Sequence, residues 1–199
     1  MGNYLSAQSP IPPCHRAGRP ALVQGLGRWL HRLSGWQLVG AIPEHPKLIL
    51  AVGPHTSNWD FLVGIVAMLA LDLRVHFLAK HTLFRWPVAG LLRALGGMAV
   101  DRGNATGIAE QIGSQLRDAE QLVIAITPEG TRKKVPRLKT GFVRIARAGN
   151  CPVQPVTFDF ARRIIQLHEP FFPGADPEGD AQEVRAIFAG ATAKRPANF

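Results

Sequence analysis

Apolar residues recur along most of this 199-residue chain either in short uninterrupted runs or in longer stretches with helical spacing. The run KLILAVG at 47–53 is typical of a buried strand, whereas the stretch at 58–71 is typical of a helix. The pattern predicts strands at 47–53, 74–79, 97–101, 121–127, 152–159 and 163–168, and helices at 58–71, 87–95, 104–118, 140–149 and 177–189. This alternation predicts an α/β fold, a single domain over 21–199 with a mostly parallel sheet flanked by helices.

The chain before residue 40 follows a different pattern. Residues 1–20 are rich in Pro and Ser, so we expect a disordered tail there. Residues 21–39 predict an N-terminal amphipathic helix with one apolar stripe. The stripe consists of Leu22, Leu26, Trp29, Leu30, Leu33 and Trp36. Such a helix either packs on the protein's own core or lies on a membrane, and two tryptophans beside arginines favour the membrane-facing interpretation.

Charge and composition narrow the choice of partners. Lys and Arg number 23 against 14 Asp and Glu, a net charge of +9 that favours an anionic membrane surface, a phosphorylated substrate or a nucleic acid. The basic run at 132–139 has no interleaved aromatic residue, so we expect no nucleic acid partner. No apolar run approaches the ~20 residues of a spanning helix. Two cysteines, Cys14 and Cys151, cannot make a disulfide framework and indicate a reducing compartment. We therefore expect a cytoplasmic protein, peripherally associated with the inner face of the membrane.

The segment HTSNWD places candidate chemistry at the junction between the strand at 47–53 and the helix at 58–71. With Ser57 or Asn58 as helix cap, Asp60 falls in the first turn, where the helix dipole favours a carboxylate. His55 can then fold back onto Asp60, which fixes its tautomer and leaves the second ring nitrogen as a base. The alternative is a capping Asp near an unrelated surface His.

Two further segments place polar residues after predicted strands. TPEGTRKK at 127–134 offers Gly130 for a tight turn, the hydroxyl of Thr131 and the planar guanidinium of Arg132, which suits a phosphate. Glu129 could pair with an arginine and hold it in place. GGMAVDR at 96–102 ends its strand near Arg102. The alternatives are a solvated polar loop and a surface arginine.

Together these segments resemble the glycerolipid acyltransferase family that includes the lysophosphatidic acid acyltransferases. The matching motifs, in the family's order, are His-x4-Asp (His55 and Asp60), KHTLFRWPVAG (80–90), GGMAVDR (96–102), Pro-Glu-Gly-Thr-Arg (128–132) and CPVQPV (151–156). The resemblance covers residues 47 to 159. Pro54 and Lys133 depart from the family's frequent Asn and Ser, which leaves the acceptor open to a second lyso-lipid, such as a lyso-amino-acid lipid.

The resemblance implies an O-acyltransferase of phospholipid biosynthesis. It would move a fatty acyl group from acyl-CoA or acyl carrier protein to the hydroxyl of a lysophospholipid, with 1-acylglycerol-3-phosphate as the expected acceptor. His55 would act as the base and Asp60 would orient it. The acceptor phosphate would be held by Arg102, Gly130, Thr131, Arg132 and, with less support from the motifs, Lys80, while Glu129 would position an arginine.

The chain contains no sequence motif typical of nucleotide-binding or serine-nucleophile enzymes. It has no Gly-x4-Gly-Lys loop, no Gly-x-Gly-x2-Gly fingerprint and no Ser nucleophile elbow, so we expect no nucleotide cofactor and a direct transfer of the acyl group. His76 and His81 lack partners at metal-ligand spacing, so we expect no metal site. The rival class is a non-catalytic basic module that binds membrane, which would leave the His-Asp pair without a role.

Overall fold

A sheet of eight strands forms the centre of the computed structural model, which describes residues 4–5, 11–100 and 105–199. The strands are β1 (Tyr4–Leu5), β2 (Gln37–Val39), β3 (Lys47–Gly53), β4 (His76–Lys80), β5 (Gly97–Val100), β6 (Leu122–Ile126), β7 (Val153–Asp159) and β8 (Ile164–Leu167). Their order is β1-β2-β8-β7-β3-β6-β4-β5. Only the β1–β2 and β7–β8 pairs of this described sheet are antiparallel, so the predicted mostly parallel sheet is confirmed.

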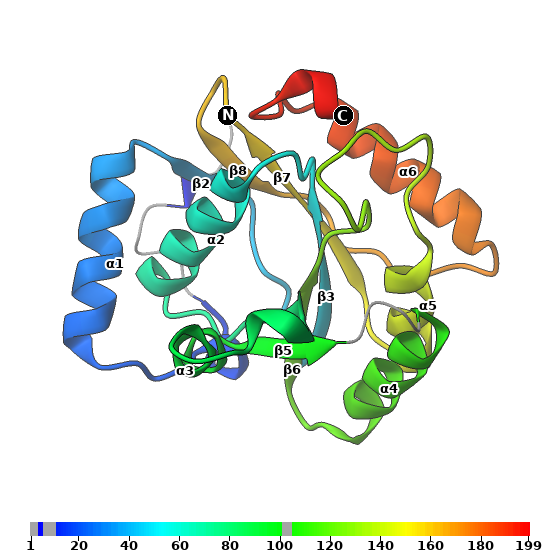
Figure 1. Ribbon diagram of the computed structural model, residues 1–199, viewed down its shortest axis with the longest axis horizontal. Helices are drawn as coiled ribbons and strands as arrows, with labels where there is room; N and C mark the ends of the chain where they lie inside the picture. Colours follow the sequence, from blue (N-terminus) through cyan, green and yellow to red (C-terminus); the bar gives the residue numbers. More distant parts are fainter. Residues whose placement is uncertain (1–3, 6–10, 101–104) are drawn as a thin grey trace.

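Helices cover both faces of the sheet. They are α1 (Ala21–Ser34), α2 (Asn58–Ala70), α3 (Val88–Ala94), α4 (Ala105–Asp118), α5 (Gly141–Ala148) and α6 (Pro177–Ala189), with short 3-10 turns η1 (Pro13–His15), η2 (His81–Leu83) and η3 (Pro196–Asn198). Figure 1 shows α1 and α2 on one side of the sheet and α4, α5 and α6 on the other. Each strand and helix predicted between 47 and 189 is confirmed, with its described ends within two residues of the prediction.

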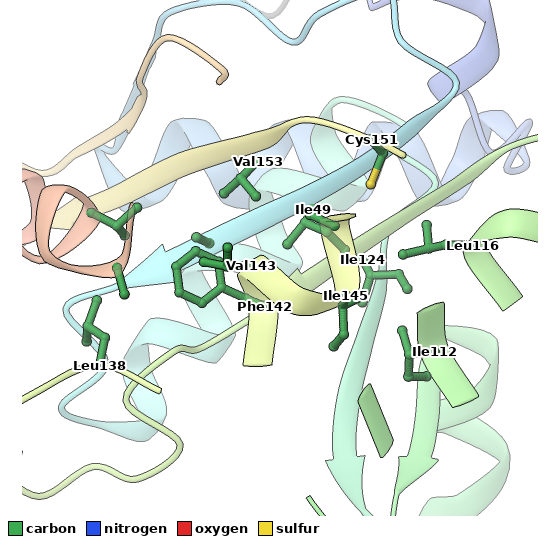
Figure 2. Close-up of a cluster of buried hydrophobic side chains, with 14 of the residues drawn as sticks. Ile49, Ile112, Leu116, Ile124, Leu138, Phe142, Val143, Ile145, Cys151 and Val153 are labelled. Carbon is green, nitrogen blue, oxygen red and sulfur yellow. The ribbon is translucent and has the colours of Figure 1, made fainter. Parts of the chain in front are cut away.

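The central strand β3 is buried on both faces, which explains its uninterrupted apolar run. Ile49 faces a cluster that includes Ile124 of β6 and Phe142 of α5, all of them at most 1% exposed (Figure 2). Leu48 and Leu50 point to the opposite face, where they pack with Ala67 of α2. Neighbouring side chains of a strand alternate between the two faces of the sheet. A strand covered on both faces therefore shows no alternation of polar and apolar residues.

Residues 11–20 are packed against the body, so the predicted disordered tail is wrong for this part. Ile11 and His15 are buried, and Arg16 forms an antiparallel bridge with Leu73 just beyond α2. The carboxylate of Asp72 accepts hydrogen bonds from the backbone N–H groups of Gly18 and Arg19 at 3.0 and 3.1 Å. Tertiary contacts thus order a segment whose composition indicates disorder. Residues 1–3 and 6–10 of the predicted tail lie outside the described residues.

The predicted helix at 21–39 is correct for 21–34 and wrong for 35–39. Gly35 adopts the left-handed conformation (φ +69°), and its N–H donates to the carbonyl of Arg32, which ends α1. The chain then enters β2 at Gln37. Trp36 leaves the predicted stripe and packs edge-on against Phe158 and Phe160, at ring-centroid distances of 6.3 and 4.9 Å.

Helix α1 is amphipathic, but its larger apolar side chains face outward. Leu22, Leu26, Trp29 and Leu33, which we call the α1 stripe, are between 53% and 86% exposed. The inner side of the helix is built around Gly27, which is buried against Leu69 and Ala70 of α2. None of the helices in the described part of the chain has the length and apolar character needed to cross a bilayer.

Because α1 and α2 pack closely at Gly27, alanine should affect stability differently at Gly27 and at Gly25 of the same helix. A Cβ at Gly27 would lie 2.7 Å from backbone atoms of Leu69 and Ala70, whereas a Cβ at Gly25 meets nothing within 4 Å. Ala at either position gains about 1 kcal/mol of helix propensity, but Gly27→Ala must also separate the helices, at about 1–3 kcal/mol. Urea denaturation should find Gly27→Ala less stable than Gly25→Ala by that second amount. Equal stabilities would contradict the close packing.

Candidate active site

The loop between β3 and α2 carries the candidate catalytic residues. β3 ends at Gly53, where a side chain would collide with the ring of Phe188 on α6, so only glycine lets the strand pass this close. Ser57 is the N-cap of α2, and its hydroxyl oxygen accepts from the N–H of Trp59 at 3.1 Å. His55 therefore lies at the carboxyl end of a central parallel strand, the edge where α/β folds bind ligands.

Asp60 is fixed in the first turn of α2 by three hydrogen bonds. Its Oδ2 accepts from the N–H groups of Thr56 and Ser57, each at 2.8 Å, and its Oδ1 accepts from the Ser57 hydroxyl at 3.1 Å. These contacts form a reciprocal capping box, so the predicted cap at Ser57 is correct. Asp60 is at once a helix cap and a buried carboxylate with one face toward His55.

The imidazole of His55 faces this carboxylate. Its Nδ1 lies 3.2 Å from Oδ2 of Asp60, and the Asp60 side chain is only 1% exposed. A hydrogen on Nδ1 would point at the carboxylate, which leaves Nε2 as the ring nitrogen available to a substrate. The structure thus brings together the two residues of the His-x4-Asp motif, and helix capping alone does not account for the position of the ring.

Hydrogen bonds keep Asp60 ionised although it is buried. Burial alone raises the pKa of Asp60, but hydrogen bonds from His55 and Ser57 outweigh burial and hold the pKa below its ordinary value. An ionised carboxylate beside Nδ1 stabilises the imidazolium that forms when Nε2 takes up a proton. The pair is therefore suited to general-base chemistry.

Glu129 supports His55 from the backbone side. It is 2% exposed, and its Oε1 and Oε2 both accept from the N–H of His55, at 3.1 and 2.8 Å. Burial raises the pKa of Glu129, and the hydrogen bond from His55 and the charge of Arg185 offset part of that rise. Among the described residues the hydrogen-bond donor to Glu129 is the His55 backbone, and the pairing of Glu129 with an arginine stays a prediction from the sequence.

The loop after β6 brings two cations to the same edge of the sheet. Gly130 has a φ of +66°, and the loop folds back so that the N–H of Lys139 donates to the carbonyl of Pro128 at 2.9 Å. The Lys139 side chain then lies against Gly130, where a Cβ would be 3.1 Å from Nζ. Arg132 and Lys139 both line the cavity described next, but the sequence did not indicate Lys139.

A cavity of about 470 Å³ opens beside His55. His55, Asp60, Gly130, Arg132 and Lys139 contribute its polar lining at the strand ends. Most of the remaining lining is apolar, and part of it follows α2 from its first turn to beyond its last, through Phe61, Gly64, Ile65, Met68, Leu71 and Leu73. The 13 residues of α2 span about 20 Å, so the cavity can hold an extended hydrocarbon chain alongside the reactive imidazole.

Three of the predicted binding residues lie away from this cavity or outside the described residues. Lys80 ends β4, two strands from β3 in the sheet, and is exposed outside the cavity lining. The hydroxyl of Thr131 accepts from the N–H of Lys133 at 3.3 Å and stabilises the loop. Arg102 lies outside the described residues, so its predicted role stays a prediction from the sequence.

Comparisons with known proteins match both the sequence and the fold. Residues 40–159 match the family model described as Acyltransferase. The crystal structure of the 1-acyl-sn-glycerophosphate (LPA) acyltransferase PlsC from Thermotoga maritima superimposes with a TM-score of 0.64 at 22% sequence identity, over 85% of this chain and 76% of that one. That likeness shows a shared fold. A comparison with curated protein sequences finds no significant match.

Proposed function

Since this chain belongs to the acyltransferase family, we propose that it is an O-acyltransferase that moves a fatty acyl group from an acyl thioester to the hydroxyl of a lysophospholipid. The acceptor that we propose is 1-acylglycerol-3-phosphate, which places the reaction in phospholipid biosynthesis. The observation that carries the proposal is the His55–Asp60 pair at the mouth of an apolar cavity, beside Arg132 and Lys139.

The proposed reaction needs one proton carrier. Nε2 of His55 takes the proton from the acceptor hydroxyl while that oxygen attacks the thioester carbonyl carbon. A C–O bond forms, the C–S bond breaks, and the imidazolium returns the proton to the departing thiolate sulfur. Asp60 stabilises the imidazolium through Nδ1. Glu129, by holding the backbone N–H of His55, keeps the imidazole over the cavity.

The charges at the cavity mouth support a phosphate on the acceptor. The Arg132 guanidinium can grip a phosphate with two hydrogen bonds, and Lys139 adds a second positive charge beside Gly130. The apolar lining along α2 suits an acyl chain. Acyl-CoA and acyl carrier protein present the same thioester, so both remain candidate donors, and acyl carrier protein a candidate partner.

The competing acceptor is a lyso-lipid without a phosphate, such as a lyso-amino-acid lipid. Thiol release should be measured with 1-acylglycerol-3-phosphate, an uncharged monoacylglycerol and a lyso-amino-acid lipid, each with wild type and Arg132→Ala. We expect the phosphate-bearing acceptor to be preferred, and Arg132→Ala to raise its KM by about tenfold or more, with little change in the donor KM. An unchanged acceptor KM would contradict a phosphate contact at Arg132. Absence of thiol release with every acceptor would favour a non-catalytic membrane module.

We also propose that the α1 stripe holds the protein peripherally on the inner, cytoplasmic face of an anionic membrane. Its exposed leucines and tryptophan could enter the headgroup boundary, with Arg28 and Arg32 of the same helix near the anionic lipid. Leu22→Glu with Trp29→Glu should weaken sedimentation with anionic vesicles by about tenfold or more. Because both side chains are exposed, circular dichroism should be unchanged. Binding equal to that of wild type would contradict the assignment.

A further inference from the structure

A second apolar surface projects from the segment between β4 and β5. Trp86 is 92% exposed, and Leu83, Val88 and Leu91 are 47–61% exposed. We call these four residues the α3 patch, because they lie on or directly before α3. The segment resembles a family motif in sequence, but neither the His-Asp pair nor the phosphate cations use these side chains.

Helix α3 is apolar on both of its sides. On the inner side, Leu92 lines the cavity, and Leu95, just past the helix, packs against the cluster of Ile11, Met68 and Leu73. On the outer side, Val88 and Leu91 are three residues apart and share an exposed face. A cluster of large apolar side chains exposed on a protein surface commonly marks an interaction site. The outer side of α3 therefore indicates a partner surface.

The charges of the chain segment that carries the α3 patch indicate that this partner is anionic. From Leu73 to Val100 the sequence contains no Asp or Glu, and its cations are Arg74, Lys80, Arg85 and Arg93. All four of these side chains belong to exposed residues. Exposed Trp and Leu interspersed with Arg and Lys form the composition of segments that lie in the interface of anionic membranes.

The patch also adjoins the cavity that the proposed reaction uses. Leu83 belongs to the α3 patch and lines the cavity, and Leu92 lines the cavity from the inner side of α3. The same short segment thus has one surface toward solvent and another toward the apolar cavity. A lipid surface against α3 would let a hydrocarbon chain pass from bilayer to cavity without crossing water.

We propose that the α3 patch is a membrane-docking surface, separate from the α1 stripe, that binds anionic phospholipid and admits the acyl chain of the acceptor to the cavity. The second half of this proposal rests on the proposed function. A bilayer is favoured over a protein partner because Trp86 projects almost fully into solvent, directly after Arg85 and two residues before the exposed Val88, as an interfacial anchor does.

The test uses the full chain and vesicles of phosphatidylcholine with or without phosphatidylglycerol. Trp86→Glu with Leu91→Glu should weaken binding to the anionic vesicles by about tenfold or more. The matched control is Phe172→Glu with Ala186→Glu, which adds the same charge at exposed positions outside the patch and should bind as wild type does. Trp86→Ser alone repeats the test at the most exposed side chain if the double variant loses its fold.

Vesicle binding, oligomeric state and acyl transfer, measured for each variant, together separate the outcomes. Normal vesicle binding by the folded patch variants would overturn the proposal. If wild type proves to be a dimer and the variants become monomers that still bind vesicles, the patch joins two copies of the chain, and the proposal is overturned as well. Equal losses in variant and control would show a charge effect only and would also overturn it. Support requires a selective loss of binding, with acyl transfer to vesicle-embedded acceptor reduced and transfer to a short-chain soluble acceptor retained. A selective loss in a protein without any acyl transfer would uphold the docking surface and reject the proposed function.

Discussion

Replacement of His55 with alanine should lower kcat for acyl transfer by about 10²–10⁴-fold and leave the fold intact, because general-base catalysis contributes on that order. The imidazole lines the cavity and contacts Asp60 at the cavity's edge, so its loss removes the proton acceptor without opening the core. Steady-state kinetics with saturating donor and acceptor measure the loss. Circular dichroism and thermal unfolding verify the fold.

His45→Ala is the matched control for this variant. His45 precedes the same strand at its opposite end, where Nδ1 lies 2.6 Å from the carbonyl oxygen of Lys47. It also contacts the ring of Phe172 edge-on and is absent from the cavity lining. We expect His45→Ala to keep wild-type kcat. Near-normal turnover by a folded His55→Ala protein would remove His55 from the mechanism.

Asp60→Asn should lower kcat by about 10²–10⁴-fold as well, with little change in KM. The amide keeps the size of the side chain, and its oxygen can still accept from Nδ1 at the position of Oδ2, but the substitution removes the charge that stabilises the imidazolium. An effect on kcat alone indicates an interaction made in the transition state. Kinetics over a range of acceptor concentrations separate the two constants.

Ser57→Ala separates the catalytic role of Asp60 from its role as a cap. Ser57 is the other half of the capping box, so its loss should cost about 1 kcal/mol of stability. The contact of 3.2 Å between His55 and Asp60 does not depend on the Ser57 hydroxyl, so kcat should stay close to wild type. If Asp60→Asn proves silent in kcat while both variants lose stability, Asp60 is only a helix cap.

The pH dependence of stability gives a second signature of Asp60. Its pKa is lowered in the folded state, so the carboxylate stabilises the fold at pH values above the ordinary Asp pKa of about 4. That contribution disappears as the pH falls through the lowered pKa. Urea denaturation from pH 7 downward should show a smaller acid-induced loss for Asp60→Asn than for wild type. An identical loss in both proteins would contradict the lowered pKa.

The fold between residues 47 and 189 was predictable because each element there has a strong and local pattern. The strand at 47–53 is apolar without interruption since both of its faces are buried. The segments before residue 40 were harder to predict for a physical reason. Residues 11–20 are ordered by Asp72 and by a pocket for Ile11, which are distant in sequence. At 35–39 the helical spacing of apolar residues continues to Trp36 and favours a longer helix. Gly35, which ends the helix in the structure, is the local signal against that extension.

The candidate site was predictable as far as it is local. His55 and Asp60 are linked by the start of one helix, so their spacing alone indicates a contact. The contact of Glu129 with the backbone of His55 joins positions 74 residues apart, and no spacing rule indicates it. Lys139 reaches Gly130 only because its own loop folds back onto Pro128. The cavity could not be predicted from the sequence either, because its apolar lining has the same residue types as a packed core.

The central claim, direct transfer by His55 from a thioester to a lipid hydroxyl, is tested most directly by following a radiolabelled acyl group. Purified protein would be incubated with labelled acyl-CoA and 1-acylglycerol-3-phosphate, and the label traced in lipid, fatty acid and protein fractions. We predict that the label appears in diacylglycerol-3-phosphate, with one thiol released per product, none on the protein, and negligible transfer by His55→Ala. Label bound covalently to the protein, or recovered only as free fatty acid, would contradict the account.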